Sequence, residues 1–222
     1  MFSPDDFEKR FATFPKQYWK NFDFIWKWKI KVEANSSAHI LDDNHRKEAY
    51  AKLCNILPKW QTYRNGDNSE PLKTLERALI NIAEEYNQLR NYTLLEFDKI
   101  PIELLAKVWH ELGRVKEKNG SRNKNGYYSA IAVTKPLLLM WGQTPAFDSR
   151  VRSHMAQSYS IPKYSCNWRL DDWTRATNQL SETLKTSVKL AEFMKEETIR
   201  RYGEKTTVPY GRYIDVYYWK GP

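Results

Sequence analysis

The sequence predicts an all-α fold, and three observations lead to this class. Apolar residues recur at spacings of three and four along most of the chain, which is the period of an amphipathic helix. Few segments alternate apolar and polar residues as strands do. Pro71 and Pro101 each precede an apolar stripe, the position at which proline begins helices. The chain of 222 residues is long enough to build one good-sized core, so we expect a single domain over 1–222. This domain could consist of two lobes, with one lobe around 100–160.

The first predicted helix, Tyr18–Lys31, is rich in aromatic and basic residues. Its spacing directs one set of side chains toward the core and leaves another set in solvent. We expect Phe22, Ile25, Trp26 and Ile30 to be buried and Lys20, Lys27, Lys29 and Lys31 to be solvated.

Further helices follow from their apolar stripes. One helix begins at Asp42 or Asp43 and buries Ala49, Leu53 and Ile56. The apolar stripe after Pro71 is Leu72, Leu75, Leu79, Ile82, Tyr86 and Leu89, and the stripe after Pro101 is Ile102, Leu105, Val108, Trp109 and Leu112. An apolar helix covers Pro136–Trp141, and one long helix covers Asp171–Arg201.

Two segments have no helical stripe. Lys116–Gly126 contains two glycines, three asparagines and four cations and cannot bury a face, so we expect an exposed loop. Val208–Tyr218 has alternating aromatic residues, which is typical of a short strand or an extended strap.

The composition favours a polyanionic partner. The formal net charge is +9 and the isoelectric point is near 9.4. Clustered Lys and Arg release condensed counterions when they neutralise phosphates, which makes nucleic acid the natural partner. Aromatic residues make up 14% of the chain, enough to fill a core and also to offer platforms for an unstacked base.

Several classes of site are disfavoured by the cysteine and histidine usage. Cys54 and Cys166 are the only cysteines and stand far apart, which argues against a disulfide framework, an iron–sulfur cluster and a cysteine zinc site. The four histidines have no metal-binding spacing, so we expect no metal and no cofactor. No apolar run reaches about eighteen residues and no signal-peptide segment follows Met1, so we expect a cytoplasmic protein without a membrane partner.

The most informative stretch for function is 134–154, in which an apolar helix is followed by a turn and a basic helix. Gly142 and Pro145 bracket the turn, because glycine ends helices and proline cannot continue one. Asp148 then falls at the N-cap of the next helix, where its carboxylate accepts backbone N–H groups and the helix macrodipole favours its anionic form. Capping alone is the ordinary role of such an aspartate, so the case for chemistry depends on the rest of the chain.

The segment 145–151, Pro-Ala-Phe-Asp-Ser-Arg-Val, resembles the catalytic-aspartate segment of the helix–hairpin–helix (HhH-GPD) superfamily of base-excision DNA glycosylases. The strong part of the resemblance covers 134–154. It implies an HhH-GPD-like helical architecture with a basic DNA-binding face, double-stranded DNA as the partner, and a monomer. It assigns to Asp148 the role of catalytic carboxylate, and to Ser149 the hydroxyl position beside it.

The chain departs from that family in three features. The loop 116–126 stands where the family has a hairpin of an apolar residue, proline and two glycines; the four-cysteine cluster is absent; and the lysine of bifunctional members lies one to two helical turns upstream of Lys135. We expect Lys135 at the far end of the apolar helix from Asp148. A Schiff base needs an amine within bonding distance of the sugar, so we expect a monofunctional enzyme and keep Lys135 as a second candidate catalytic residue.

The chemistry of such an enzyme accounts for the remaining predicted site residues. Breaking an N-glycosidic bond places positive charge on the sugar, which an ionised Asp148 can stabilise while it orients or deprotonates the attacking water. The target base must first leave the stack and enter a pocket with aromatic or apolar walls. The aromatic residues nearest to Asp148 in the sequence are the predicted walls of this pocket, with packing in the core as the alternative role for each. They are Trp109, Tyr127, Tyr128, Trp141 and Phe147.

Polar and cationic residues around the motif are the predicted contacts to DNA phosphates, with a merely solvated basic surface as the alternative. They are Lys116, Lys118, Arg122 and Lys124 in the loop and Ser149, Arg150, Arg152 and His154 on the basic helix.

Two other functions fit the same residues. A non-catalytic helical DNA-binding protein would use Asp148 only as a cap. A small helical RNase or toxin would use Arg150 and His154 for phosphate chemistry, with His154 as the general base. Within the glycosylase hypothesis the excised base stays open, and it includes damaged bases in DNA repair and modified bases of phage DNA in antiviral defence.

Overall fold

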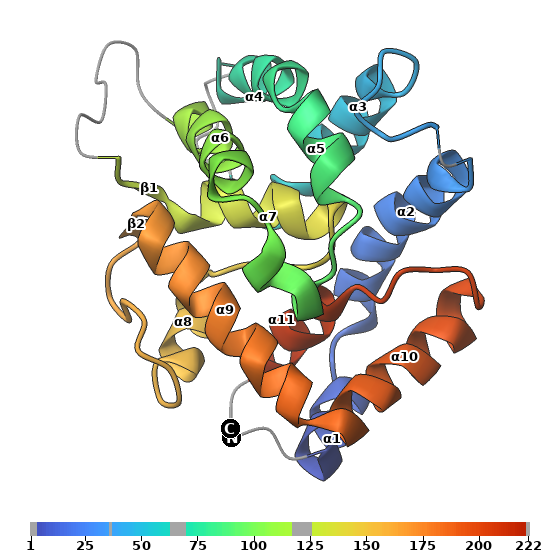
Figure 1. The fold of residues 1–222 in the computed structure, drawn as a ribbon, viewed down its shortest axis with the longest axis vertical. Coiled ribbons are helices and arrows are strands. Elements are labelled where there is room, and N and C mark those ends of the chain that lie inside the picture. The colour runs from blue at the N-terminus through green and yellow to red at the C-terminus, as the bar shows by residue number, and fades with distance from the viewer. Residues whose placement is uncertain (1–3, 36, 63–69, 117–125, 221–222) are drawn as a thin grey trace.

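The computed structural model describes residues 4–35, 37–62, 70–116 and 126–220. Most of these residues are helical, so the predicted all-α class is confirmed. Figure 1 shows the helix α7 near the centre of the molecule, with the other helices around it. The elements are α1 (Pro4–Ala12), α2 (Lys16–Glu33), α3 (Arg46–Ile56), α4 (Glu70–Asn81), α5 (Ala83–Leu89), η1 (Leu94–Lys99), α6 (Ile102–Gly113), η2 (Arg114–Lys116), β1 (Tyr128–Ser129), α7 (Ala130–Met140), α8 (Ser149–Met155), β2 (Asn167–Trp168), α9 (Leu170–Thr186), α10 (Val188–Tyr202) and α11 (Tyr210–Lys220).

The central position of α7 follows from its composition. Every residue of this helix except Ile131 is buried, and a helix that is apolar all round is stable only inside a core. The helix begins at Ala130, well before the predicted start at Pro136, and Pro136 lies inside it. This earlier start changes the position of Lys135, which lies in the middle of the helix rather than at its end.

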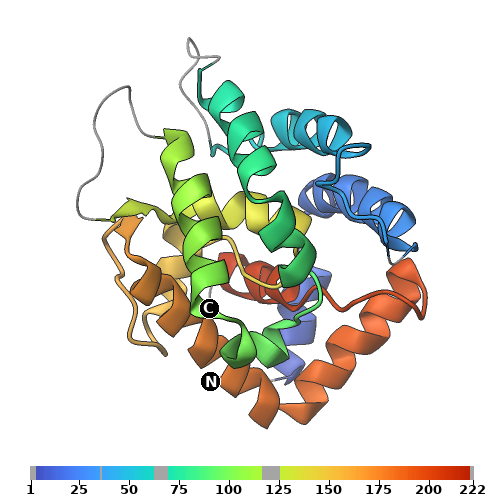
Figure 2. The same ribbon diagram turned by 45° about the horizontal axis from the view of Figure 1, so that its top comes forward.

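In the described part of the chain, a small two-stranded sheet lies at one end of α7. Tyr128 of β1 pairs with Trp168 of β2, and Ser129 pairs with Asn167, in an antiparallel arrangement. The two strands tie the segment before α7 to the segment before α9, as Figure 2 also shows.

Most of the apolar side chains predicted to be buried in the first half of the chain are buried, but Ile102, the first residue of the stripe after Pro101, is 50% exposed. Phe22, Ile25 and Trp26 of α2 are in the core, and so are Leu75, Leu79, Ile82, Tyr86 and Leu89 along α4 and α5. Lys29 was expected in solvent, and this prediction is wrong. It is buried, and its ammonium group lies 2.7 Å from a carboxylate oxygen of Glu33 one turn later. A lysine on the buried face is tolerated because the ion pair compensates its charge.

The predicted long helix Asp171–Arg201 is instead two helices, α9 and α10, which meet at Ser187. Ser187 leaves the helical conformation with φ −106° and ψ 64°. Just before it, the Thr186 hydroxyl bonds the carbonyl oxygens of Glu182 and Thr183. Hydroxyl side chains that bond nearby carbonyls weaken the helix, and here the chain turns.

The segment Val208–Tyr218 forms most of the helix α11, so the predicted strand or strap is wrong. Residues 209–218 are all buried. Alternating aromatic residues indicate a strand only when one face is solvated, whereas α11 is enclosed on all sides and packs against α8 and α1. This helix forms one wall of the cavity described below.

Within the described ranges, no helix combines the length and the apolar character needed to cross a membrane.

Candidate functional site

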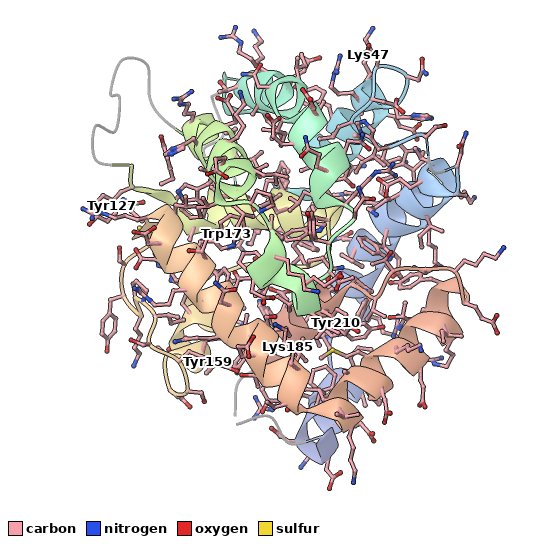
Figure 3. All side chains as sticks on the ribbon, viewed as in Figure 1. Lys47, Tyr127, Tyr159, Trp173, Lys185 and Tyr210 are labelled. Carbon is pink, nitrogen blue, oxygen red and sulfur yellow. The ribbon has the colours of Figure 1, made fainter. Side chains whose placement is uncertain are left out.

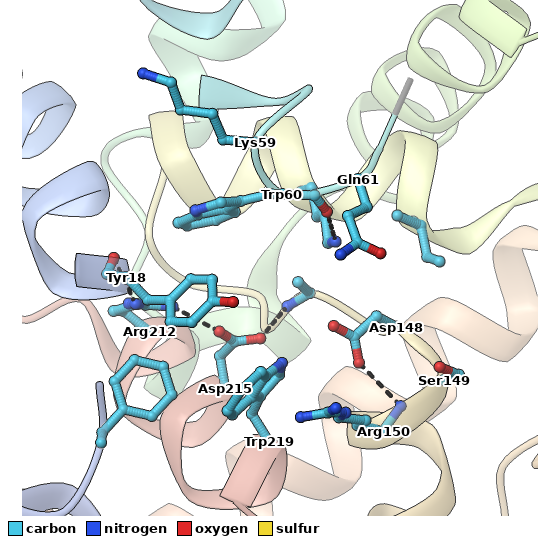
Figure 4. Close-up of a pocket in the computed structure, with 14 residues that line it drawn as sticks. Tyr18, Lys59, Trp60, Gln61, Asp148, Ser149, Arg150, Arg212, Asp215 and Trp219 are labelled. Carbon is cyan, nitrogen blue, oxygen red and sulfur yellow. Dashed lines mark hydrogen bonds and ion pairs between the residues drawn. The ribbon is translucent and has the colours of Figure 1, made fainter. Parts of the chain in front are cut away.

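A cavity of about 300 Å³ lies where α2, α7, α8 and α11 meet the segment that follows α3. This volume is in the range of small-ligand sites. Its walls include four aromatic side chains and two carboxylates: Phe14, Tyr18, Trp60, Trp219, Asp148 and Asp215. Figure 4 shows Trp60 above and Trp219 below the two carboxylates.

Asp148 is the N-cap of α8, as the sequence predicted. Its Oδ1 accepts the backbone N–H of Arg150 at 3.0 Å and that of Val151 at 3.1 Å. These bonds fix the carboxylate at the positive end of the helix. Figure 4 shows the other oxygen of Asp148 turned toward the cavity and toward Asp215. The residue therefore presents a fixed, half-buried anion to whatever enters.

The turn that carries Asp148, here called the 141–148 turn, is held by side chains from three helices. The N–H of Phe147 donates to Thr134 Oγ1 of α7 at 3.1 Å. The N–H of Ala146 donates to Asp215 Oδ1 of α11 at 3.1 Å. The carbonyl of Phe147 accepts from Arg152 Nη1 of α8 at 2.8 Å. Backbone groups of the two residues before Asp148 are thus fixed, which is how a site preorganises a charge.

Two glycines let the 141–148 turn approach its neighbours. Gly142 has φ +77°, and a Cβ atom there would lie 2.5 Å from the ring of Trp26. A Cβ on Gly211, at the start of α11, would lie 2.5 Å from the backbone nitrogen of Thr144. The N–H of Gly211 also donates to the carbonyl of Gly142 at 2.8 Å. The turn and α11 are therefore packed backbone to backbone.

We expect Gly142→Ala to destabilise the protein more than Gly203→Ala does. Both glycines have positive φ, so both variants strain the backbone, but a Cβ on Gly203 would meet nothing within 4 Å. The additional loss at Gly142 comes from overpacking against Trp26 and is about 1–3 kcal/mol. Urea unfolding of the two variants measures it, and equal losses would contradict this packing.

Asp215 forms a buried ion pair with Arg212 one turn earlier on α11. Its Oδ2 lies 2.7 Å from Arg212 Nη1, and the two side chains are 6% and 2% exposed. Arg212 Nη2 also donates to the carbonyl of Tyr18 at 3.0 Å. Burial and, to a smaller extent, the negative charge of Asp148 raise the pKa of Asp215 to about 6, against the lowering effect of Arg212. Above that pH the carboxylate is ionised and neutralises the guanidinium.

Lys135 lies in the same cavity as Asp148, so its predicted remote position is wrong. It is buried at 7% exposure, and its ammonium group donates to the backbone carbonyl of Trp60. The correction follows from the length of α7, because Lys135 in the middle of that helix faces the cavity. The two candidate catalytic residues are therefore brought together.

The five predicted wall residues do not line this cavity. Trp109, Trp141, Phe147 and Tyr128 are buried in the core. Trp109, for example, stacks on Trp173 with ring centroids 5.3 Å apart, and Figure 3 shows Trp173 in the interior of the molecule. Tyr127 lies at the edge of the molecule beside β1, where the guanidinium of Arg169 lies 4.4 Å from its ring centroid. The reason is that residues next to a central helix point into the core.

The aromatic walls come instead from segments distant in sequence. The rings of Tyr18 and Trp219 are 5.3 Å apart, and those of Phe14 and Trp219 are 5.5 Å apart. Trp60, from the segment after α3, lies across from them. For Tyr18 and Trp219, the only signal in the sequence is the high aromatic content near the two chain ends, and this signal does not predict which cavity they line.

The predicted phosphate contacts divide into four groups. Ser149 and Arg150 are exposed at the cavity, with the guanidinium of Arg150 4.5 Å from the ring centroid of Trp219. Arg152 is buried and bonds the Phe147 carbonyl, so it holds the turn and is not an open phosphate contact. His154 Nδ1 lies 2.6 Å from the carbonyl of Tyr218, outside the cavity lining. Lys116 ends η2, and Lys118, Arg122 and Lys124 lie outside the described residues.

Among the residues that the structure describes, no three His, Cys, Asp or Glu side chains are placed to hold a metal ion. Comparison of the chain with protein-family models, with curated proteins and with solved structures gave no match.

Proposed function

We propose that this protein is a DNA glycosylase that receives a flipped, modified or damaged base in the cavity and hydrolyses its N-glycosidic bond. One observation carries the proposal: the Asp148 carboxylate is fixed by two backbone N–H groups inside a cavity with aromatic walls. A cap that served only α8 would need neither the cavity nor the aromatic rings.

The role of Asp148 follows from where charge develops. As the bond between C1′ and the base nitrogen breaks, the sugar gains oxocarbenium character, and a fixed anion beside it lowers the energy of that state. The same carboxylate can orient a water molecule and accept its proton as the water oxygen bonds to C1′. Because the 141–148 turn is already held, the site does not have to reorganise during the reaction.

The walls of the cavity suit an unstacked base. A flipped nucleotide loses its stacking partners, and aromatic side chains replace them. Tyr18, Trp60 and Trp219 supply such surfaces around the two carboxylates. These three replace the wall residues expected from the sequence as the proposed base-contacting group.

Arg150 and Ser149 are the proposed contacts to the DNA backbone at the mouth of the cavity. Both are exposed and both line it, so they can reach the phosphates that flank a flipped nucleotide. The formal net charge of +9 supports binding to duplex DNA in general.

The resemblance to the HhH-GPD superfamily belongs to this proposal. What supports it is the local arrangement: the apolar helix α7, the 141–148 turn, and an aspartate at the N-cap of α8. The hairpin that defines the superfamily would correspond to the segment before β1, most of which lies outside the described residues.

A panel of modified duplexes and phage genomes tests the proposed function. After incubation with the protein, heat or alkali cleaves DNA at abasic sites. Strand breaks after alkali at one modified base support the proposal, and the responding substrate tells repair from defence. Intact DNA throughout, with binding retained, would favour a non-catalytic DNA-binding protein, whereas cleaved RNA would favour an RNase.

We expect excision to stop at an intact abasic site. Lys135 lines the cavity, but its side-chain nitrogen donates a hydrogen bond to the Trp60 carbonyl, and that bond must break before the nitrogen can attack a sugar. A Schiff base requires the uncharged amine. Borohydride should therefore trap no protein–DNA adduct. An adduct that forms with the wild type and disappears in Lys135→Ala would make the enzyme bifunctional.

A further inference from the structure

The outer face of α2 carries four lysines that form a stripe, Lys16, Lys20, Lys27 and Lys31, with Phe24 between them. At about 100° per residue these positions fall within roughly 80° of the helix circumference, so they share one face. Lys16, Lys20, Lys27 and Lys31 are exposed, and the Phe24 side chain is 47% exposed. We call these five residues the lysine stripe.

The cations of the lysine stripe make no ion pair within the described part of the chain. The contrast with Lys29 on the buried face of the same helix is direct, because that lysine pairs with Glu33 at 2.7 Å. Asp23 lies beside the stripe, and its carboxylate accepts a hydrogen bond from the Tyr202 hydroxyl at 2.5 Å rather than pairing with a stripe lysine. With four cations and this one acid beside them, the surface is net positive.

A neighbouring helix adds to this surface. Lys52 of α3 places its ammonium 4.1 Å from the ring centroid of Phe24 and 5.2 Å from that of Trp28. Lys52 also pairs with Glu48 at 3.2 Å. Together with Lys20, Asp23, Lys27 and Lys31 these side chains line a shallow groove. The groove combines cations with aromatic surface, the two features that proteins use to track a nucleic-acid strand.

The exposed face of α10 mixes the two signs. On α10, Lys189 and Lys195 are interspersed with Glu192 and Glu196. Such a mixture suits solubility and gives no field of one sign. The lysine stripe is different, and the difference cannot follow from the high net charge alone.

The dimensions of the lysine stripe fit a nucleic-acid backbone. From Lys16 to Lys31 the helix rises roughly 22 Å at 1.5 Å per residue. Phosphates on one DNA strand follow each other at about 3.4 Å along the axis, so this length corresponds to roughly six base-pair steps. A membrane surface fits less well, because Phe24 is the one well-exposed apolar side chain on the described part of α2, while Trp19, Phe22, Ile25 and Trp26 are buried and cannot insert.

The lysine stripe does not face the cavity. Tyr18, which lines the cavity, is on the opposite side of α2, about 200° from Lys16 by the same helical geometry. Figure 1 places α2 at the edge of the molecule. DNA that delivers a base into the cavity would therefore meet a different surface.

We propose that the lysine stripe is a second nucleic-acid-binding surface, which holds the phosphate backbone of a DNA duplex at a place separate from the cavity. The argument uses the charges and spacing of α2 and does not depend on base excision. It assigns a role to side chains that the proposed glycosylase chemistry leaves unused.

Charge reversal on two helices tests this proposal. Lys27→Glu/Lys31→Glu changes the stripe, and Lys189→Glu/Lys195→Glu is the control with the same change in net charge. Binding of an unmodified duplex is measured by fluorescence anisotropy at several salt concentrations. The stripe variant should lose at least about tenfold in affinity, and its slope of log K against log salt should be about 2 smaller in magnitude. The control should lose less than about threefold.

If the lysine stripe and the mouth of the cavity bind DNA independently, the losses of affinity caused by variants in the two places should multiply. The fold-loss of a variant combining Arg150→Ala with the stripe changes should equal the product of the two separate losses. Equal losses in the stripe variant and its control would overturn the proposal, since net charge alone would then explain binding. Loss of binding to phosphatidylserine vesicles with duplex binding intact would overturn it in favour of a membrane. The binding titration does not depend on base excision. A failure of the lysine-stripe proposal is therefore distinguishable from a failure of the glycosylase proposal.

Discussion

Asp148→Asn is expected to abolish base excision and to leave the fold intact. Asparagine is as good an N-cap as aspartate, so the bonds from the N–H groups of Arg150 and Val151 can persist. What is lost is the negative charge that stabilises the oxocarbenium ion and accepts the proton of water. Removing one preorganised electrostatic group typically costs about 10²–10³-fold in rate, and we expect at least that loss in single-turnover excision.

The control for this variant is Asp171→Asn. Asp171 also lies in the first turn of a helix, α9, but it does not line the cavity. Its replacement should leave the excision rate within about twofold, because a surface charge at a helix end affects stability only slightly. Duplex affinity of Asp148→Asn should stay close to that of the wild type, since phosphate contacts supply most of it. Undiminished excision by Asp148→Asn would remove this residue from the mechanism.

The second large effect is expected in stability. Asp215→Ala leaves the guanidinium of Arg212 buried without its partner and leaves the N–H of Ala146 without an acceptor. Breaking one side of a buried ion pair costs about 3–5 kcal/mol in the free energy of unfolding. Urea unfolding above pH 7, where Asp215 is ionised, measures this loss.

Two companion variants separate the parts of that effect. Asp215→Asn can still accept the Ala146 N–H, so a smaller loss is expected from it than from Asp215→Ala. Asp215→Leu/Arg212→Met removes both charges, and replacing a buried ion pair with apolar residues is often close to neutral. The double variant should therefore be more stable than Asp215→Ala. A loss below about 1 kcal/mol for Asp215→Ala would contradict the structural role assigned to the pair.

The sequence predicted the features that depend on local physics. Helical periodicity identified the all-α class and the buried faces of α2, α4 and α6, because a stripe of apolar residues needs no tertiary information. The N-cap role of Asp148 was also predicted, since a Gly/Pro turn followed by an acid is a local signal.

Features that depend on tertiary packing were missed. The alternating aromatics of α11 look like a strand until the helix is seen to be buried on all sides. Asp215 was not singled out, although it faces Asp148, because it stands within that segment. Tyr18, Trp60 and Trp219 come from parts of the chain that only the fold brings together.

The error over Lys135 has a specific cause. A proline ahead of an apolar run indicates a helix that begins at Pro136, which would leave Lys135 outside it. The helix begins at Ala130 and accommodates the proline inside the core, where its neighbours keep the chain helical. A proline therefore gave a local boundary signal that the packing of α7 overrides.

The most direct test of the central claim is mass spectrometry of the base released from a modified duplex. Wild-type protein and Asp148→Asn are incubated at equal concentration with each duplex of the panel, and free base and abasic sites are counted in the same sample. The proposed function predicts that the wild type releases one kind of free base and an equal number of abasic sites, and that Asp148→Asn releases neither. Duplexes left intact by the wild type, or base release that Asp148→Asn retains in full, would contradict it.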